Sequence, residues 1–289
     1  MDAMPLKTVK ALHPAVRDDI GDLTTRRPVP GPGLDQVDPF LFLNHHGPQT
    51  YGPNNGGLPF GPHPHRGFET VTFILEGELA HRDSAGHESI IKTGGVQWMT
   101  AGSGIVHAEV SPDEFRKTGG PLELLQLWVN LPSRLKMSPP RYVGVQVDQI
   151  PAVPVDQGAA VVHLISGTWG GNAGPIPSLT GAFMTTIDFK AGGKAGFGSL
   201  AGRSVFLYVV SGEVKVNGIA TTAWHLAELD TEGDTVEFEA ATDAVIVFGH
   251  ADPIGEPVVA HGPFVMNTRE EIVEAIRDYN AGLFDKVSA

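Results

Sequence analysis

Two pairs of side chains in the first half of the chain have the types and spacing of metal ligands. His63 and His65 lie two residues apart in HPHRGFETVTFILEG, and His107 and Glu109 lie two apart in GSGIVHAEV. Side chains two apart on a strand point to the same face, so each pair would aim at one place. Pro64 supports an extended segment, because a proline disfavours helical backbone in the residue before it. On neighbouring strands, the two pairs would surround one cation.

Imidazole and carboxylate ligands suit several first-row metals. Fe, Mn, Ni, Cu, Co and Zn all accept them, and the ligand types alone do not choose among these ions. Either pair by itself is more often a pair of surface or pocket side chains than a metal site, so it is their combination that favours a metal. Glu69 lies an even number of residues beyond His65, so it would point to the same face as the two histidines in a strand without a bulge.

The composition argues against several other kinds of function. The 289 residues include no cysteine, which excludes disulfides, thiolate ligands and cysteine nucleophiles. A formal net charge of −13 opposes contact with phosphate backbones and anionic membranes, so we expect no direct nucleic-acid or membrane partner. The sequence also lacks an apolar leader and an apolar run of the roughly 18 residues that a membrane span needs. We therefore expect a cytoplasmic protein.

Short strands must position these ligands. Runs of β-branched and aromatic residues alternate with Gly, Pro and Asn turns, which is typical of a β-sandwich or barrel. The segments TVTFILEGELAHR and SVFLYVVSGEVKV share one rhythm, an apolar strand, then Gly-Glu, then a second strand. Aligning Gly77 with Gly212 separates the two copies by about one domain length, which indicates an internal duplication. His63 and His65 then align with Gly198 and Leu200, so we expect no metal in the second copy.

The duplication leads to a prediction of domain boundaries. We predict an N-terminal metal-binding barrel over residues 1–135, a proline-rich linker over 136–158 and a C-terminal barrel without metal over 159–289. The C-terminal barrel would end in an amphipathic helix over 268–284. Thr268 and Glu271 have the spacing of a capping box at its start. Its predicted apolar face consists of Ile272, Val273, Ile276 and Tyr279.

A resemblance to the pirin family, within the cupin superfamily, is carried by HPHRGFETVTFILEGELAHRD and VQWMTAGSGIVHAEV. DPFLFL, LELLQLWVNLPS and GPFVMNTREEIVEAIRDYNAGLF also resemble pirin segments, so nearly the whole chain is covered. The resemblance implies an all-β fold of two tandem cupin (double-stranded β-helix, jelly-roll) barrels with a C-terminal helix. It implies one metal ion in the N-terminal barrel, with iron as the first choice. The ligands that it implies are His63, His65, His107 and Glu109, whereas Glu69 is the ligand in many other cupins.

Two kinds of function follow from the resemblance. Some pirins resemble quercetinases, which cleave flavonols such as quercetin with O₂ and release carbon monoxide. Glu109 would then be catalytic, taking the substrate's hydroxyl proton. Other pirins are regulators whose iron state alters the surface offered to a transcription factor or metabolic enzyme, and an acidic surface would suit a basic protein partner. We expect a monomer, because two barrels joined in one chain can pack against each other without a second copy of the chain.

Several residues near the predicted site have open roles. Gln126 lies in an apolar strand and could contact a ligand. His45 or His46 could cover the pocket entrance, but we predict both on an exposed loop, and we predict His81 and His87 on the surface. The residues that would either line an apolar pocket or simply pack the barrel are Phe68, Phe73, Trp98, Met99 and Leu127.

Overall fold

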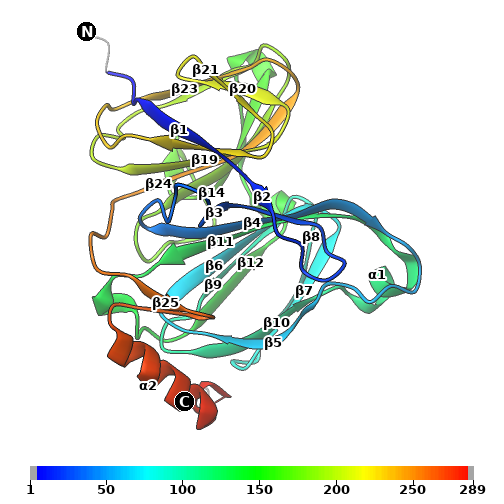
Figure 1. Ribbon diagram of the computed structural model, residues 1–289. Coiled ribbons are helices and arrows are strands. Elements are labelled where there is room, and N and C mark those ends of the chain that lie inside the picture. Colours follow the sequence, from blue (N-terminus) through cyan, green and yellow to red (C-terminus); the bar gives the residue numbers. More distant parts are fainter. Residues whose placement is uncertain (1–4, 286–289) are drawn as a thin grey trace. The chain divides into compact units, whose positions relative to one another are not determined.

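The computed structural model describes residues 5–285, and its strands are shown in Figure 1. The described residues form two compact units, each made mainly of antiparallel sheets. One unit, here called the N-terminal barrel, contains residues 17–26, 41–147 and 254–285. The other, the C-terminal barrel, contains residues 5–16, 27–40 and 148–253. No helix in this described part of the chain is long and apolar enough to cross a membrane.

Two antiparallel sheets form the N-terminal barrel. In spatial order, the larger sheet consists of β12 (Arg141–Val145), β9 (Val96–Thr100), β6 (Phe68–Glu76), β11 (Gly120–Asn130), β4 (Phe40–Tyr51), β3 (Thr25–Val29) and β2 (Val16–Arg17). The smaller sheet consists of β5 (Phe60–His65), β10 (Ile105–Val110), β7 (Glu78–Asp83) and β8 (Glu88–Lys92). Ile74 and Leu124 of the larger sheet share an apolar core with Leu79 and Ile91 of the smaller one.

The sequence pattern of these strands explains which side chains face inward. In β10, Ile105, His107 and Glu109 are buried and alternate with partly exposed residues, as period two requires. β6 is almost wholly buried on both faces, and it lies in the interior of the larger sheet with β9 and β11 on either side. Gly77 joins β6 to β7 with a φ of 86°. A Cβ there would lie 2.7 Å from the Pro121 carbonyl oxygen, so this turn requires glycine.

The C-terminal barrel repeats this plan. In spatial order, its larger sheet consists of β1 (Val9–Pro14), β22 (His225–Leu229), β19 (Ser204–Ser211), β24 (Ala244–Ala251), β17 (Phe183–Phe189), β14 (Ala160–Ser166) and β13 (Ala152–Val155). Its smaller sheets are β18 (Lys194–Phe197), β23 (Val236–Ala240), β20 (Glu213–Val216) and β21 (Ile219–Thr222), and the pair β15 (Thr168–Trp169) and β16 (Asn172–Ala173). Gly212 turns between β19 and β20 with a φ of 79°, like Gly77 in the first copy.

The remaining elements are short. The helices are α1 (Asp113–Thr118) and α2 (Arg269–Asn280), the 3₁₀ turns are η1 (Ser133–Leu135), η2 (Val147–Gln149), η3 (Asp156–Gly158) and η4 (Leu283–Asp285), and β25 (Val259–His261) pairs with β26 (Phe264–Met266). The predicted helix over 268–284 was too long, because α2 ends at Asn280 and Gly282 then takes a φ of 70°. Its predicted apolar face was also partly wrong. Ile272 is buried, whereas Val273 is 66% exposed.

The capping box at the start of α2 is present. The Thr268 side chain accepts a hydrogen bond from the Glu271 backbone at 3.2 Å, and the Glu271 carboxylate accepts one from the Thr268 backbone at 3.0 Å. Thr268→Ala is therefore expected to lower the free energy of unfolding by about 1 kcal/mol. Urea denaturation would measure this, with Thr268→Ser as the matched control that keeps the oxygen. Equal losses in both variants would contradict the prediction.

The two units differ from the domain boundaries predicted from the sequence. β1 pairs with β22, so the first described residues belong to the C-terminal barrel. Residues 254–285, with α2, belong to the N-terminal barrel instead of the second one. The predicted linker over 136–158 is also structured, since β12 pairs with β9 and β13 pairs with β14. Long-range strand pairing places these segments, and local composition does not reveal it.

Candidate metal centre

Three of the four predicted ligands converge in the N-terminal barrel. His63 and His65 end β5, and His107 lies on β10 directly opposite His63. The ring centroids are 4.4 Å apart for His63 and His107, 4.8 Å for His63 and His65, and 5.0 Å for His65 and His107. One nitrogen from each ring lies within 4.8 Å of the others. This closeness allows the three imidazoles to bind one cation.

Burial keeps two of these imidazoles neutral, which is the form that binds metals. His65 is 4% exposed and His107 is 1% exposed. Loss of hydration lowers the pKa of His65 to about 3, and repulsion from His63 adds to the shift. The same loss of hydration, together with the neighbouring imidazoles, holds the pKa of His107 well below its usual value.

The ring nitrogens of His107 provide a test of whether a metal fits. Neither nitrogen has a hydrogen-bond partner among the described residues, although both are buried. Such orphaned polar atoms are costly unless something satisfies them. The other two rings each use Nδ1 as a donor to a carbonyl oxygen, His63 to Gly61 at 2.7 Å and His65 to Pro263 at 3.3 Å. Their Nε2 atoms therefore carry the lone pairs that could bind a cation, so the three residues fit a metal.

Glu109, the fourth predicted ligand, lies outside this group among the described residues. Its carboxylate is 1% exposed and accepts hydrogen bonds from three donors. Thr72 Oγ1 donates to Oε1 at 2.9 Å, Gln97 Nε2 donates to the same oxygen, and Gln126 Nε2 donates to Oε2 at 2.5 Å. Thr72 pairs in register with both Gln97 and Gln126, so the donors lie side by side on three adjacent strands of the larger sheet.

The alternative carboxylate, Glu69, is also outside the histidine group among the described residues. It lies on β6 opposite Thr100, whose hydroxyl donates to Oε1 at 2.6 Å. Glu69 is 1% exposed, and this burial raises its pKa to about 7. Glu69 is therefore a buried group whose charge is costly at neutral pH.

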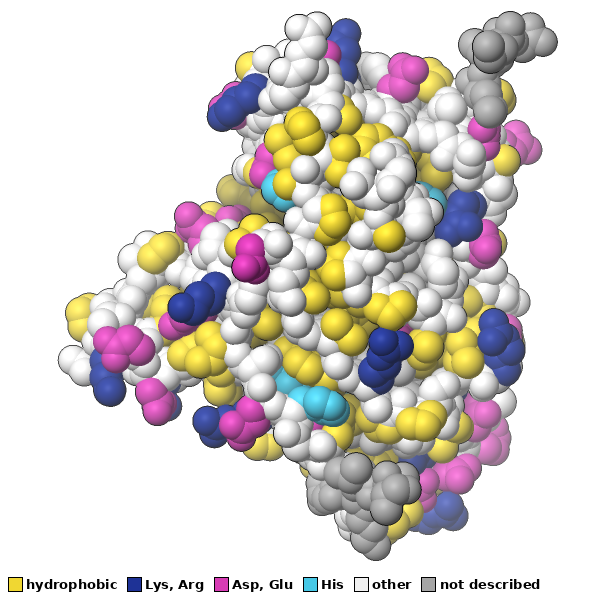
Figure 2. All heavy atoms as spheres, turned by 180° about the vertical axis from the view of Figure 1, so that it is seen from behind, with side chains coloured by type: hydrophobic (Ala, Val, Ile, Leu, Met, Phe, Trp, Pro, Cys, Tyr) yellow, Lys and Arg dark blue, Asp and Glu magenta, His cyan; other side chains and the backbone are white. Residues whose placement is uncertain are grey.

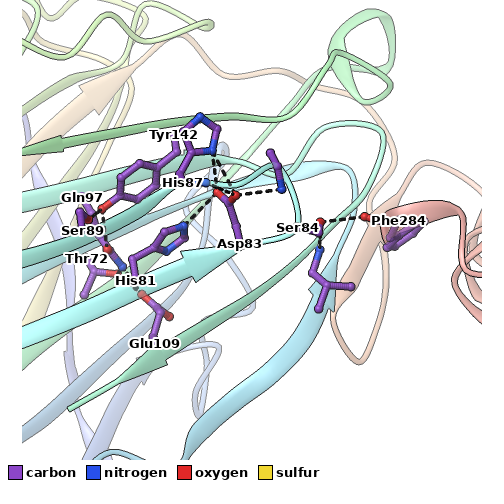
Figure 3. A network of polar contacts seen from close by, with 12 residues as sticks. Thr72, His81, Asp83, Ser84, His87, Ser89, Gln97, Glu109, Tyr142 and Phe284 are labelled. Carbon is purple, nitrogen blue, oxygen red and sulfur yellow. Dashed lines mark hydrogen bonds and ion pairs between the residues drawn. The ribbon is translucent and has the colours of Figure 1, made fainter. Parts of the chain in front are cut away.

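A polar network behind Glu109 was not anticipated from the sequence (Figure 3). Tyr142 donates to Gln97 Oε1 at 3.2 Å and shares a 2.5 Å hydrogen bond with Ser89. Because Tyr142 uses the oxygen of the Gln97 amide, the amide N–H groups point toward Glu109. The ring of Tyr142 stacks on His81 at 4.0 Å. A glutamine inside an apolar strand, as in VQWMT, is the signal that could have identified Gln97.

Predictions for the surrounding histidines were partly wrong. His45 and His46 are not on an exposed loop, because β4 continues through them and both are at most 1% exposed. His45 contacts Glu123 at 2.8 Å, and His46 shares a hydrogen bond with Thr25 at 2.8 Å. His81 is buried beside Asp83, whereas the His87 side chain is 43% exposed, as predicted.

An aromatic wall lies beside His65. Phe68 and Trp128 contact the His65 ring, with centroids 5.1 Å and 5.6 Å away. Trp128 also packs against Phe42 at 4.6 Å. The residues proposed as pocket lining or core are all buried: Phe68, Phe73, Trp98, Met99 and Leu127. On the face shown in Figure 2, histidine side chains reach the surface next to hydrophobic ones, and charged side chains are scattered.

Comparison with known proteins identifies the family. The protein-family model described as Pirin matches residues 22–129 of the sequence. A second family model, described as Pirin C-terminal cupin domain, matches residues 184–285. A pirin-like protein of Caulobacter vibrioides is 40% identical over 286 residues, which covers 97% of this chain and 100% of that protein. The chain belongs to the pirin family.

Other relatives agree with this assignment. Human pirin is 38% identical over 262 residues, covering 88% of this chain and 85% of that protein. A crystal structure of quercetin 2,3-dioxygenase from Acinetobacter baumannii has a TM-score of 0.92 and 34% identity, and covers 98% of this pirin and 100% of that chain. The predicted fold of two tandem cupin barrels with a small C-terminal helix is thereby confirmed.

Proposed function

We propose that this pirin is a metal-dependent dioxygenase that opens the central ring of flavonols such as quercetin with O₂. The observation that carries the proposal is the convergence of His63, His65 and His107, with Glu109 buried two residues from His107 on the same strand. The high similarity to a solved structure named quercetin 2,3-dioxygenase supports the substrate class.

The three histidines would hold the ion. His63 and His65 would use Nε2, because their Nδ1 atoms donate to backbone carbonyl oxygens. A bound iron ion would act as a Lewis acid toward the flavonol oxygen, and a site with three protein ligands leaves positions for substrate. Iron is the proposed metal because of the family resemblance, and Mn, Ni, Cu, Co and Zn are the alternatives.

Glu109 would act as the general base. Its carboxylate would take the proton of the flavonol hydroxyl, and Thr72, Gln97 and Gln126 would hold its oxygens in place. The ring-opened product would contain an ester and a carboxylate, and each of these groups would receive one atom of O₂. The carbon that bore the hydroxyl would leave with its own oxygen as carbon monoxide. The proton would finally pass from Glu109 to the product carboxylate. Phe68 and Trp128 would help to keep water from the reacting anion.

The test is direct. Protein loaded separately with each of the six metals is mixed with quercetin in air. At least one form is expected to consume quercetin and release an equal amount of carbon monoxide, while metal-free protein does neither. If every form binds its metal but none releases carbon monoxide, the dioxygenase proposal is wrong. The regulatory alternative would then be tested by comparing the partners that the Fe(II) and Fe(III) forms retain from a native extract.

A further inference from the structure

A segment from the far end of the chain contacts both strands that carry the histidines. We call residues 263–284 the C-terminal brace; it includes β26, α2 and the start of η4. The brace follows the whole C-terminal barrel in sequence, yet it belongs to the N-terminal barrel, where Figure 1 shows α2 in red. The Pro263 carbonyl, at its start, accepts the hydrogen bond from His65 Nδ1 across 198 sequence positions.

The backbone of the brace lies directly against the residues that follow His65. Val265 donates its N–H to the Arg66 carbonyl at 3.1 Å. Gly67 makes this approach possible, because a Cβ there would lie 2.0 Å from the Val265 oxygen. Gly67 also has a φ of 91°, which favours glycine. A side chain at this position would therefore push the brace away from His65.

A buried lysine ties the two backbones together. Lys136 is 1% exposed, and its ammonium donates to the carbonyl oxygens of Gly67 at 2.9 Å and Val265 at 3.0 Å. Its third hydrogen bond goes to Asn130 Oδ1 at 2.8 Å. A buried ammonium with three acceptors is strongly held in one place. Lys136 thus fixes the distance between the brace and the residues that follow β5.

Side chains of the brace extend the contact to the other ligand strand. The Arg66 guanidinium binds Asp278 of α2 at 3.0 Å and lies 4.6 Å from the centre of the Phe284 ring. The Phe284 carbonyl accepts from Ser84 Oγ at 2.8 Å (Figure 3). Ser84 Oγ in turn accepts from the backbone N–H of Val106, the residue before His107, at 3.2 Å. The brace therefore supports residues next to both His65 and His107.

We propose that the C-terminal brace positions the metal ligands His65 and His107, with the Pro263 carbonyl holding His65 so that its Nε2 faces the ion. This inference rests on the metal centre of the proposed function but not on the reaction. A carbonyl that accepts from a metal-bound imidazole fixes its tautomer and ring orientation, and loss of such a partner lowers metal affinity about 10–100-fold. Loosening the brace should therefore weaken metal binding without removing any ligand.

Two acidic residues one turn apart on α2 offer a matched comparison. The Asp278 side chain is 14% exposed and binds Arg66, whereas the Glu274 side chain is 56% exposed and binds only the surface residue Arg277 among the described residues. The Kd for Co(II) is measured by competition with a chromophoric chelator, and the visible spectrum of bound Co(II) reports its coordination. Asp278→Ala is expected to raise the Kd for Co(II) about tenfold and to change the visible spectrum of the bound Co(II). Asp278→Glu should restore part of the affinity, and Glu274→Ala should match the wild type.

Each outcome distinguishes the proposals. If the wild-type protein does not bind Co(II), the metal centre and the proposed function fail together. If the wild type binds Co(II) and folded Asp278→Ala binds it with the same Kd and spectrum, the brace has no positioning role, while the proposed function stands. Circular dichroism establishes that the variant is folded. Should Asp278→Ala not fold, Asp278→Asn carries the same comparison with a smaller loss of packing.

Discussion

His107→Ala is expected to lower the affinity of the protein for its metal by more than about 100-fold. Partners outside the ligand shell are worth roughly 10–100-fold in metal affinity, and a direct ligand should be worth more. The His107 ring is about as close to His63 and to His65 as those two rings are to each other, so its loss would leave two imidazoles of the three. Elemental analysis of the protein as isolated, followed by a chelator competition, would measure the change.

His87→Ala is the control for this prediction. His87 belongs to the same barrel, but its side chain is 43% exposed and its imidazole contacts Asp83 instead of the three clustered histidines. It should keep the wild-type metal content. If His107→Ala keeps its metal as well as His87→Ala does, then the three imidazoles do not form the metal centre.

Glu109→Gln is expected to lower kcat for quercetin cleavage by about 10²–10⁴-fold, which is the usual contribution of a general base. The amide has nearly the same shape as the carboxylate but cannot take the hydroxyl proton. Metal content should fall much less than kcat, since His63, His65 and His107 remain. Steady-state rates, corrected for the metal content of each preparation, would measure the effect.

Glu69→Gln gives the matched comparison. Both glutamates are buried in the same barrel, and each accepts from a threonine hydroxyl. If Glu69→Gln loses the activity and Glu109→Gln keeps it, the catalytic carboxylate is Glu69. If neither change lowers the metal-corrected rate, a carboxylate base has no part in the reaction.

Sequence spacing was sufficient to predict that three histidines come together in the N-terminal barrel. The separation of two residues in each motif predicted that His63 and His65 share a face and that His107 and Glu109 share another, because side chains alternate along a strand. The structure brings the three histidines together as this requires. The role of Glu109 as a ligand stays a prediction, as do the identity of the metal and the expected absence of metal from the C-terminal barrel.

The surroundings of Glu109 depend on contacts that spacing does not encode. Gln97 and Gln126 come from strands that are not consecutive along the chain, and they flank Thr72 only because β9, β6 and β11 are adjacent and in register. Tyr142 lies in the segment predicted to be a linker, so its approach to Gln97 was not foreseen. A polar residue in an apolar strand predicts burial of a hydrogen-bonding group, but not its partner.

The sequence by itself determined the β-barrel class, the duplication around Gly77 and Gly212, the capping box of α2 and the residue types of the centre. These features are local, because they depend on side-chain alternation, turn geometry and hydrogen bonds between near neighbours. Only the tertiary structure decided that the chain's last segment returns to the N-terminal barrel and places the Pro263 carbonyl on His65. That contact arises from pairing and burial between distant segments, which no local pattern specifies.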